Sequence, residues 1–140
     1  MKMIILIPTY NEAISIVELL TELTPLQSQR HFDVMILDDN SPDKTADIVD
    51  KFALPWVSVM RRPEKAGLGA AYRAGFAQVL KNESYTHVIT MDADGSHRVA
   101  DLPAMIGANS ASLSITLGTR WIPGGSVVNW PKSRQLLSKS

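Results

Sequence analysis

Apolar and polar positions follow two spacings along this chain. Short apolar runs, rich in Ile, Val, Leu and Met, are typical of buried strands. Between them, apolar residues recur every three or four positions, which predicts helices. The predicted strands are residues 3–7, 32–37, 57–60, 87–91 and 113–117. Predicted helices begin after Asn11 and after the Ser41-Pro42-Asp43 turn, and also occupy residues 68–80 and 101–108.

Strands and helices therefore alternate from the start of the chain. This order predicts one α/β domain, with a mainly parallel sheet and helices on both of its faces. Ligands of such sheets bind beyond the carboxyl ends of the strands. We therefore expect the residues that carry chemistry just after each apolar run.

The strongest local motif is Asp92-Ala93-Asp94, after the fourth predicted strand. Its two carboxylates, one residue apart at a strand end, supply the hard oxygen ligands that Mg²⁺ or Mn²⁺ prefers. A solvated acidic turn is the plainer alternative. His97, close behind, is open to three interpretations: a further ligand, an acid/base, or neither.

A second acidic motif, with Asp38, Asp39 and Asp43, follows the second predicted strand. Carboxylates this close repel one another unless solvent, a cation or a donor-rich ligand relieves them. Asp43 suits a helix start, so we expect it to cap the next helix and Asp39 to bind ligand. Turn chemistry alone would also explain the motif.

The first strand leads into Pro8, Tyr10 and Glu12. Pro8 restricts the backbone where the chain leaves the sheet, and the Tyr10 ring can stack on a base. The Glu12 carboxylate can accept hydrogen bonds from hydroxyls or amines. The alternative is a simple strand–helix turn in which Asn11 caps the helix.

Cations follow the third and fifth predicted strands. Arg61 and Arg62 precede Gly67 and Gly69, which favours a phosphate cradle at a helix start, although a flexible loop fits equally well. The dinucleotide fingerprint lacks its third glycine, since Tyr72 stands in that position, and the Walker motif is absent. Arg120 follows the fifth run, where its planar fork could hold a phosphate or form an ordinary salt bridge.

Composition narrows the function class. The 140 residues include no cysteine, and 14 Lys and Arg balance 14 Asp and Glu, which argues against a thiolate metal site and a general nucleic-acid binder. Residues 1–70 carry a net charge of −3 and residues 71–140 a net charge of +3. This asymmetry suits a ligand with both a metal and phosphates, although chance would also produce it.

Taken together, the motifs resemble glycosyltransferase family 2, and within it the dolichol- and polyprenol-phosphate mannose synthases. The resemblance implies a GT-A fold and transfer of mannose from GDP-mannose to a polyprenyl monophosphate, with inversion and with Mg²⁺ or Mn²⁺. It places Asp92 and Asp94 at the metal, and Asp92, Asp94 and Arg120 in catalysis. The matching stretches are residues 8–12, 38–43, 67–72, 91–97, 118–121 and 124–134. The residues implied to bind the nucleotide sugar are Pro8, Tyr10, Glu12, Leu37, Asp39, Asp92, Ala93, Asp94, Arg120 and Arg134.

The same resemblance bears on location. Its members continue well beyond the point that matches Ser140, so we expect residues 1–140 to form one incomplete GT-A domain, its nucleotide- and metal-binding part.

No membrane-spanning segment is predicted. A lipid acceptor implies a cytoplasmic protein, peripheral at the cytoplasmic face of the membrane, with a membrane-anchoring domain or subunit.

Two alternatives remain at this point. Residues 88–96 also fit the strand and Asp-x-Asp-Gly-Ser pattern of haloacid dehalogenase-like phosphohydrolases, in which Asp92 would be the nucleophile. That motif normally opens its fold, whereas three predicted strands precede it here. The other alternative is a fragment that binds a nucleotide sugar without catalysis.

Overall fold

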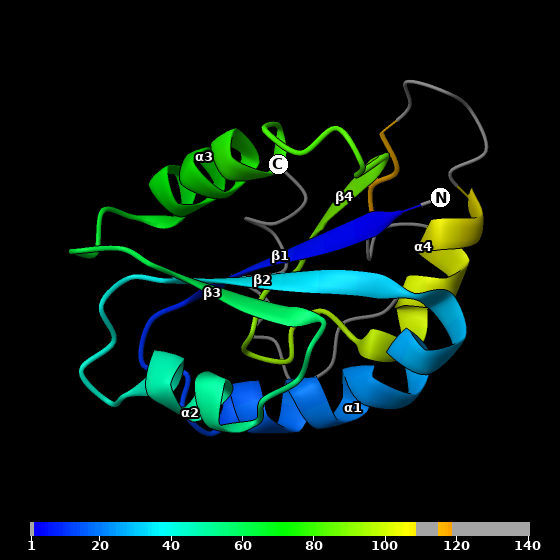
Figure 1. Ribbon diagram of the computed structural model, residues 1–140. Coiled ribbons are helices and arrows are strands. Elements are labelled where there is room, and N and C mark those ends of the chain that lie inside the picture. The colour runs from blue at the N-terminus through cyan, green and yellow to red at the C-terminus, as the bar shows by residue number, and fades with distance from the viewer. Residues whose placement is uncertain (1, 109–114, 119–140) are drawn as a thin grey trace, which may run out of the picture. The chain divides into compact units, whose positions relative to one another are not determined.

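The computed structural model describes residues 2–108 and 115–118. The chain divides into two compact units, Met1–Val99 and Ala100–Ser140. The first holds four strands and three helices in alternation, as the apolar spacing predicts (Figure 1). In chain order these are β1 (Met3–Thr9), α1 (Ser15–Arg30), β2 (Phe32–Asp38), α2 (Thr45–Lys51), β3 (Val57–Arg61), α3 (Leu68–Val79) and β4 (His87–Thr90).

The four strands form a parallel sheet in the order β3-β2-β1-β4. β1 and β2 lie in its interior, and their side chains are almost all buried, because helices cover both faces of a parallel sheet. In the register, Thr9 pairs with Asp38 at the carboxyl ends of β1 and β2. The loops that follow these strands therefore leave the sheet at one edge.

Helices flank the sheet on both faces, with α3 on one side and α1 and α2 on the other (Figure 1). Beneath α3, Leu6 and Leu37 pack in a buried apolar cluster. Gly75 permits this close approach, since a Cβ there would lie 2.8 Å from a methyl of Leu37 and 3.1 Å from one of Leu6. The α/β architecture expected from the sequence is confirmed.

Two local expectations need correction. α1 begins at Ser15 after Ile14, so Asn11 does not cap it; Asn11 instead adopts a left-handed φ of 59°. The reason is that the Asn11 and Glu12 N–H groups donate to Ser41 and Thr45 side chains, which holds this segment as a loop.

The other correction concerns the strand expected over residues 113–117. Ile115–Gly118 has no regular secondary structure, and Ile115 and Leu117 are 88% and 80% exposed. A strand needs a neighbour's hydrogen-bonding edge, and none of the pairings in the described part of the chain involves these residues. Residues 113 and 114 lie outside the described residues.

A short 3₁₀ turn, η1 (Val99–Asp101), crosses from the last residue of the first unit into the second. The second unit continues with α4 (Leu102–Ala108), in agreement with the helix expected over 101–108. Throughout the described ranges, no helix has both the length and the apolar character needed to cross a bilayer.

Candidate functional site at the carboxyl ends of the strands

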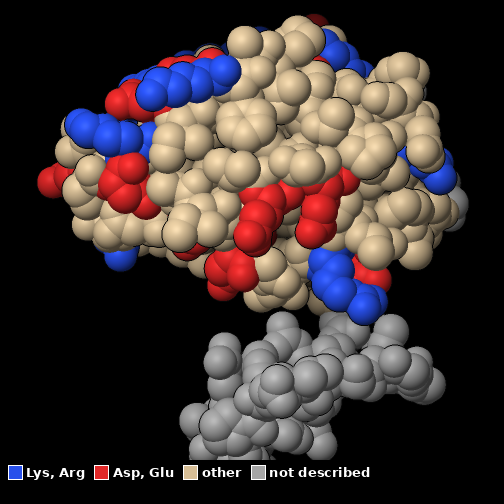
Figure 2. Space-filling model, turned by 90° about the horizontal axis from the view of Figure 1, so that it is seen from below, with Lys and Arg blue, Asp and Glu red and all other residues tan. Residues whose placement is uncertain are grey.

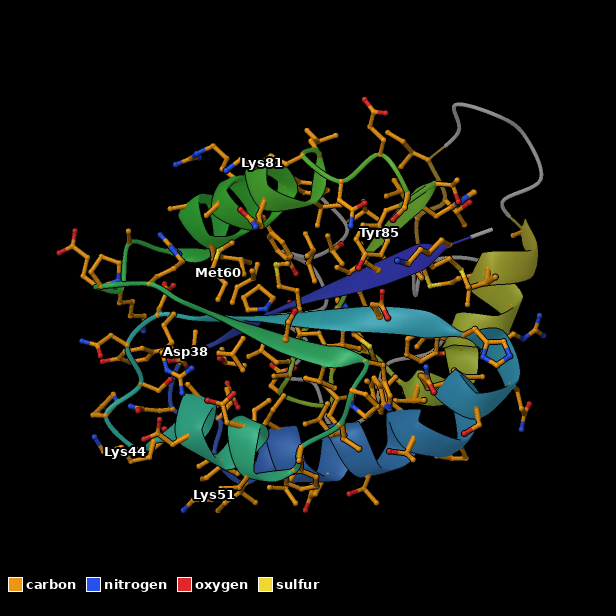
Figure 3. The ribbon with its side chains drawn as sticks, viewed as in Figure 1. Asp38, Lys44, Lys51, Met60, Lys81 and Tyr85 are labelled. Atoms are coloured by element: carbon orange, nitrogen blue, oxygen red, sulfur yellow. The ribbon has the colours of Figure 1, made fainter. Side chains whose placement is uncertain are left out.

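The loops after β1, β2 and β4 supply most of the expected site residues. β4 runs beside β1, where Leu6 pairs with Thr90, and the next N–H, from Met91, donates to the Leu6 carbonyl at 3.1 Å. Asp38, at the end of β2, lies at this edge of the sheet (Figure 3).

Asp38 is a buried structural residue. One carboxylate oxygen accepts hydrogen bonds from the Thr9 hydroxyl at 2.9 Å and the Ser41 hydroxyl at 2.6 Å, and the other accepts from the Ser41 N–H at 3.0 Å. These bonds tie the end of β1 to the loop after β2. The Asp38 carboxylate therefore holds the loops together rather than facing a ligand.

Asp39, expected at the nucleotide, is paired with Arg62. Its Oδ1 lies 2.6 Å from Arg62 Nη1, and the two side chains are only 7% and 13% exposed. Two buried charges of opposite sign compensate each other, which relieves the repulsion anticipated among the strand-end carboxylates. Sequence reasoning missed this pairing, although Arg62 directly follows β3 and β3 is the neighbour of β2.

Asp43 bridges the starts of two helices. Its Oδ1 accepts from the N–H and the hydroxyl of Thr45, the first residue of α2, and its Oδ2 accepts from the Ala13 N–H. These hydrogen bonds outweigh the effect of burial and lower the pKa of Asp43. Asp43 thus supports the helix start, as expected.

The loop after β1 carries Tyr10 and Glu12. The Lys65 ammonium lies 3.9 Å from the centre of the Tyr10 ring, a cation–π contact on the ring expected to stack on a base. The Glu12 carboxylate accepts from the Ser15 hydroxyl. A hollow of about 380 Å³ opens beside this loop, with Glu12, Asp43 and Glu18 among its lining residues.

Pro8 and Leu37 are placed side by side in the sheet register. Pro8 is half-buried, whereas the Leu37 side chain is fully buried in the cluster beneath α3. Only the main chain of Leu37 is thus left to line a ligand pocket.

The acidic pair after β4 presents two different carboxylates. Asp92 is half-buried, Ala93 is buried and Asp94 is exposed. Hydrogen bonds from the Ser96 side chain and main chain, with Ser96 N–H at 2.9 Å from Oδ1, lower the pKa of Asp94. Asp94 is therefore an ionised carboxylate at neutral pH, and its exposed oxygens are accessible as ligands for a metal ion.

Asp92 is approached by two side chains. The Tyr72 hydroxyl donates to Asp92 Oδ1 at 3.4 Å, and His97 Nδ1 accepts from the Asp92 N–H at 3.0 Å. Burial first, and then the Asp92 charge, raise the pKa of Tyr72 to about 12. Sequence reasoning gave Tyr72 no role at the acidic pair; the available signal was an aromatic residue in the first helix turns after the glycine loop.

This donor set fits Mg²⁺ or Mn²⁺. No group of three or more His, Cys, Asp or Glu with the geometry to hold a metal occurs among residues 2–108 and 115–118. Mg²⁺ sites commonly use one or two carboxylates and complete their shell with water and substrate phosphates, so Asp92 and Asp94 are the residues that would hold the ion.

The expected phosphate cations divide into two groups. Arg61 forms ion pairs with Asp47 at 2.9 Å and Asp50 at 2.6 Å, both on α2, and Arg62 forms one with Asp39. Both arginines are therefore already paired with carboxylates of the fold. Arg120 and Arg134 lie outside the described residues.

The α1 and α2 side of the molecule has a different character. Figure 2 shows acidic side chains over the middle of this view and basic ones mainly toward its margins. α1 carries exposed Glu18 and Glu22, and α2 carries exposed Asp47 and Asp50. Like charges repel, so the exposed carboxylates of this face disfavour the binding of phosphates there.

The sequence matches the Glycosyl transferase family 2 profile over residues 4–139, nearly the whole chain. The chain belongs to this family. Membership disfavours the phosphohydrolase alternative, since it accounts for the strands before the Asp-x-Asp motif as part of the same domain.

The curated proteins that this chain resembles are consistent with the family assignment. The chain is 40% identical to a polyprenol monophosphomannose synthase from Mycolicibacterium smegmatis, over 99% of this chain and 52% of the relative. It is 41% identical to an undecaprenyl-phosphate mannosyltransferase from Micrococcus luteus, over 99% and 56%. A dolichol-phosphate mannosyltransferase from Pyrococcus furiosus is 34% identical, over 99% and 39%. The chain thus spans about half the length of the first two relatives.

Solved structures show the same fold. A mannosyltransferase from Pyrobaculum calidifontis, in complex with GDP-Man and Mn²⁺, superposes with a TM-score of 0.59 and 26% identity, over 73% of this chain and 30% of that one. TarS from S. aureus superposes with a TM-score of 0.57 and 29% identity, over 77% and 33%. The GT-A architecture implied by the motifs is confirmed.

Proposed function

We propose that this chain is the nucleotide- and metal-binding part of a glycosyltransferase that moves mannose from GDP-mannose to a polyprenyl monophosphate with inversion. The observation that carries the proposal is the pair Asp92 and Asp94 after β4, in a family member about 40% identical to polyprenyl-phosphate mannosyltransferases. The Pyrobaculum relative with bound GDP-Man and Mn²⁺ supports the choice of donor.

The reaction asks little of a general base. The acceptor is a phosphate already ionised at neutral pH, and its oxygen forms the new bond to the anomeric carbon of mannose as the bond to the diphosphate breaks. GDP departs with the electron pair. The difficult part is the charge of the leaving diphosphate, which a divalent ion held by Asp92 and Asp94 would stabilise when bound.

The remaining residues take their roles around the donor. Tyr10, Glu12 and Asp39, with Pro8 and the Leu37 main chain, line the nucleotide side. Arg120 and Arg134 hold phosphates. The Asp39–Arg62 pair supplies a rigid wall there, because both partners are fixed by their ion pair.

The lipid acceptor sets the location. A polyprenyl phosphate resides in a membrane, so the protein works peripherally at the cytoplasmic face, with an anchoring domain or subunit to hold it there. Nucleic acid is not a partner, in line with equal numbers of acidic and basic residues.

The test is a transfer assay with the 140-residue chain, GDP-mannose labelled in the sugar, Mg²⁺ or Mn²⁺, and polyprenyl phosphate in detergent. Metal-dependent appearance of mannose in the lipid phase is the expected result. Metal-dependent GDP-mannose binding without transfer would favour the non-catalytic alternative. Binding of a different nucleotide sugar, with none of GDP-mannose, would refute the donor.

A further inference from the structure

Tyr72 is the point at which α3 reaches the acidic end of β4. It lies in the second turn of the helix, half-buried against the apolar cluster beneath α3, with its hydroxyl directed to Asp92 Oδ1 at 3.4 Å. Its ring also lies 6.4 Å from that of Phe76. The packing of the ring fixes where the hydroxyl can be.

The main chain of Asp92 is held from the other side. Its N–H donates to His97 Nδ1 at 3.0 Å, which requires a lone pair on Nδ1 and leaves the proton of the neutral ring on Nε2. His97 Nε2 lies 3.9 Å from Asp92 Oδ2. The two oxygens of Asp92 therefore face different neighbours, Oδ1 the phenol and Oδ2 the imidazole.

Asp94 is oriented in another way. Its hydrogen-bond donor is Ser96, two residues further on in the same turn. The direction of the Asp94 carboxylate is thus set locally, whereas that of Asp92 is set by a helix twenty residues earlier in the chain.

We propose that Tyr72 is a positioning residue: it restrains the Asp92 carboxylate through Oδ1 and so leaves Oδ2 as the oxygen that can contact the metal and diphosphate of a nucleotide sugar. The inference rests on the proposed function for its ligand, but the geometry it invokes is present without ligand. Outer hydrogen-bond partners of metal-binding side chains commonly contribute to metal affinity in this way.

The fold contains a matched control. The Tyr85 hydroxyl donates to Asp33 Oδ2 at 2.7 Å, and burial together with this hydrogen bond raises the pKa of Tyr85 to about 12. Tyr85 lies at the opposite end of the sheet from Asp38 (Figure 3). Tyr85→Phe therefore removes a phenol–carboxylate hydrogen bond of the same kind, far from the acidic pair.

The binding experiment compares Tyr72→Phe, Tyr85→Phe and the unsubstituted 140-residue chain by calorimetric titration with GDP-mannose, with Mn²⁺ or with EDTA. Phe retains the packed ring in both variants. We expect Tyr72→Phe to weaken the Mn²⁺-dependent binding about tenfold and to leave the binding in EDTA unchanged. Tyr85→Phe should change neither. Equal losses in the two variants would show a merely structural role and overturn the proposal.

A second measurement needs no ligand. NMR couplings to the Asp92 Hβ protons report its χ1 rotamer, which should be single in the unsubstituted chain and in Tyr85→Phe but averaged in Tyr72→Phe. A single, unchanged rotamer in Tyr72→Phe would overturn the positioning role. If the unsubstituted chain binds no GDP-mannose, the proposed function fails, and averaging at Asp92 still supports the role of Tyr72.

Discussion

At the scale of single residues, the strand-end carboxylates look alike in sequence and are held in different ways. Both carboxylate oxygens of Asp38 accept hydrogen bonds from neighbouring loops, and the negative charge of Asp39 is paired with the guanidinium of Arg62. Asp92 accepts a hydrogen bond from a phenol on a distant helix, whereas Asp94 accepts from Ser96 in its own turn and is exposed. The candidate metal ligands are therefore the two carboxylates that the fold does not fully use.

Asp94→Asn tests this distinction. The amide keeps the size of the side chain but removes the negative charge. The Mn²⁺-dependent affinity for GDP-mannose should therefore fall at least about thirtyfold, a loss typical of removing one interaction with a charged group. Isothermal titration measures it.

Asp47→Asn is the matched control, because Asp47 is an exposed carboxylate on α2 whose partner is Arg61. It should leave the affinity unchanged. An Asp94→Asn protein that binds as tightly as the Asp47→Asn protein would remove Asp94 from the metal site.

At the scale of elements, ion pairs and close packing join strands to helices. Arg61 and Arg62 are neighbours in sequence, but Arg61 makes exposed pairs with α2 and Arg62 a buried pair with the end of β2. Four of the five apolar runs that predicted strands form β1 to β4, whereas residues 115–117 of the fifth run are not a strand. The apolar runs could not predict which of the two arginines forms the buried ion pair, since that depends on the strand order β3-β2-β1.

Arg62→Ala should lower the free energy of unfolding by about 3 kcal/mol, because it leaves the Asp39 carboxylate buried without its cation. Arg61→Ala, the control, should cost at most about 1 kcal/mol, since its pairs are solvent-exposed. Urea denaturation measures both values. Similar losses in the two variants would contradict the buried role of the Asp39–Arg62 pair.

Gly75→Ala tests the approach of α3 to the sheet. The added methyl would lie 2.8 Å from a methyl of the fully buried Leu37, so we expect a loss of about 1–3 kcal/mol from overpacking. Gly69→Ala in the same helix meets only the end of Arg73 at 3.6 Å and should gain up to about 1 kcal/mol from helix propensity. Thermal or urea unfolding gives the sign of each change, and a stabilising Gly75→Ala would refute the close contact.

At the scale of the whole molecule, the chain is a GT-A glycosyltransferase family 2 sequence about half as long as its first two curated relatives. Its first unit contains the sheet and the two loops, after β2 and β4, that supply Asp39, Asp92 and Asp94. These three candidate carboxylates therefore all belong to Met1–Val99.

Ligand linkage should be visible in global stability. GDP-mannose with Mn²⁺ at about one hundred times its dissociation constant should raise the free energy of unfolding by about 2.7 kcal/mol, if it binds only the folded chain. Removal of the metal with EDTA should abolish the metal-dependent part of this gain. Denaturation curves at a series of ligand concentrations measure it, with Asp94→Asn as the control. A gain that persists in EDTA would show that the metal does not contribute.

The apolar spacing and the motif order were enough to predict the parallel α/β fold, the family and the edge where polar residues gather, because burial and strand direction follow from local pattern. Tertiary structure alone decided that α1 starts at Ser15, that residues 115–117 are not a strand, that Leu37 is core, and that Tyr72 meets Asp92. Each of these depends on contacts between segments far apart in the chain, and such contacts leave no periodic trace in sequence.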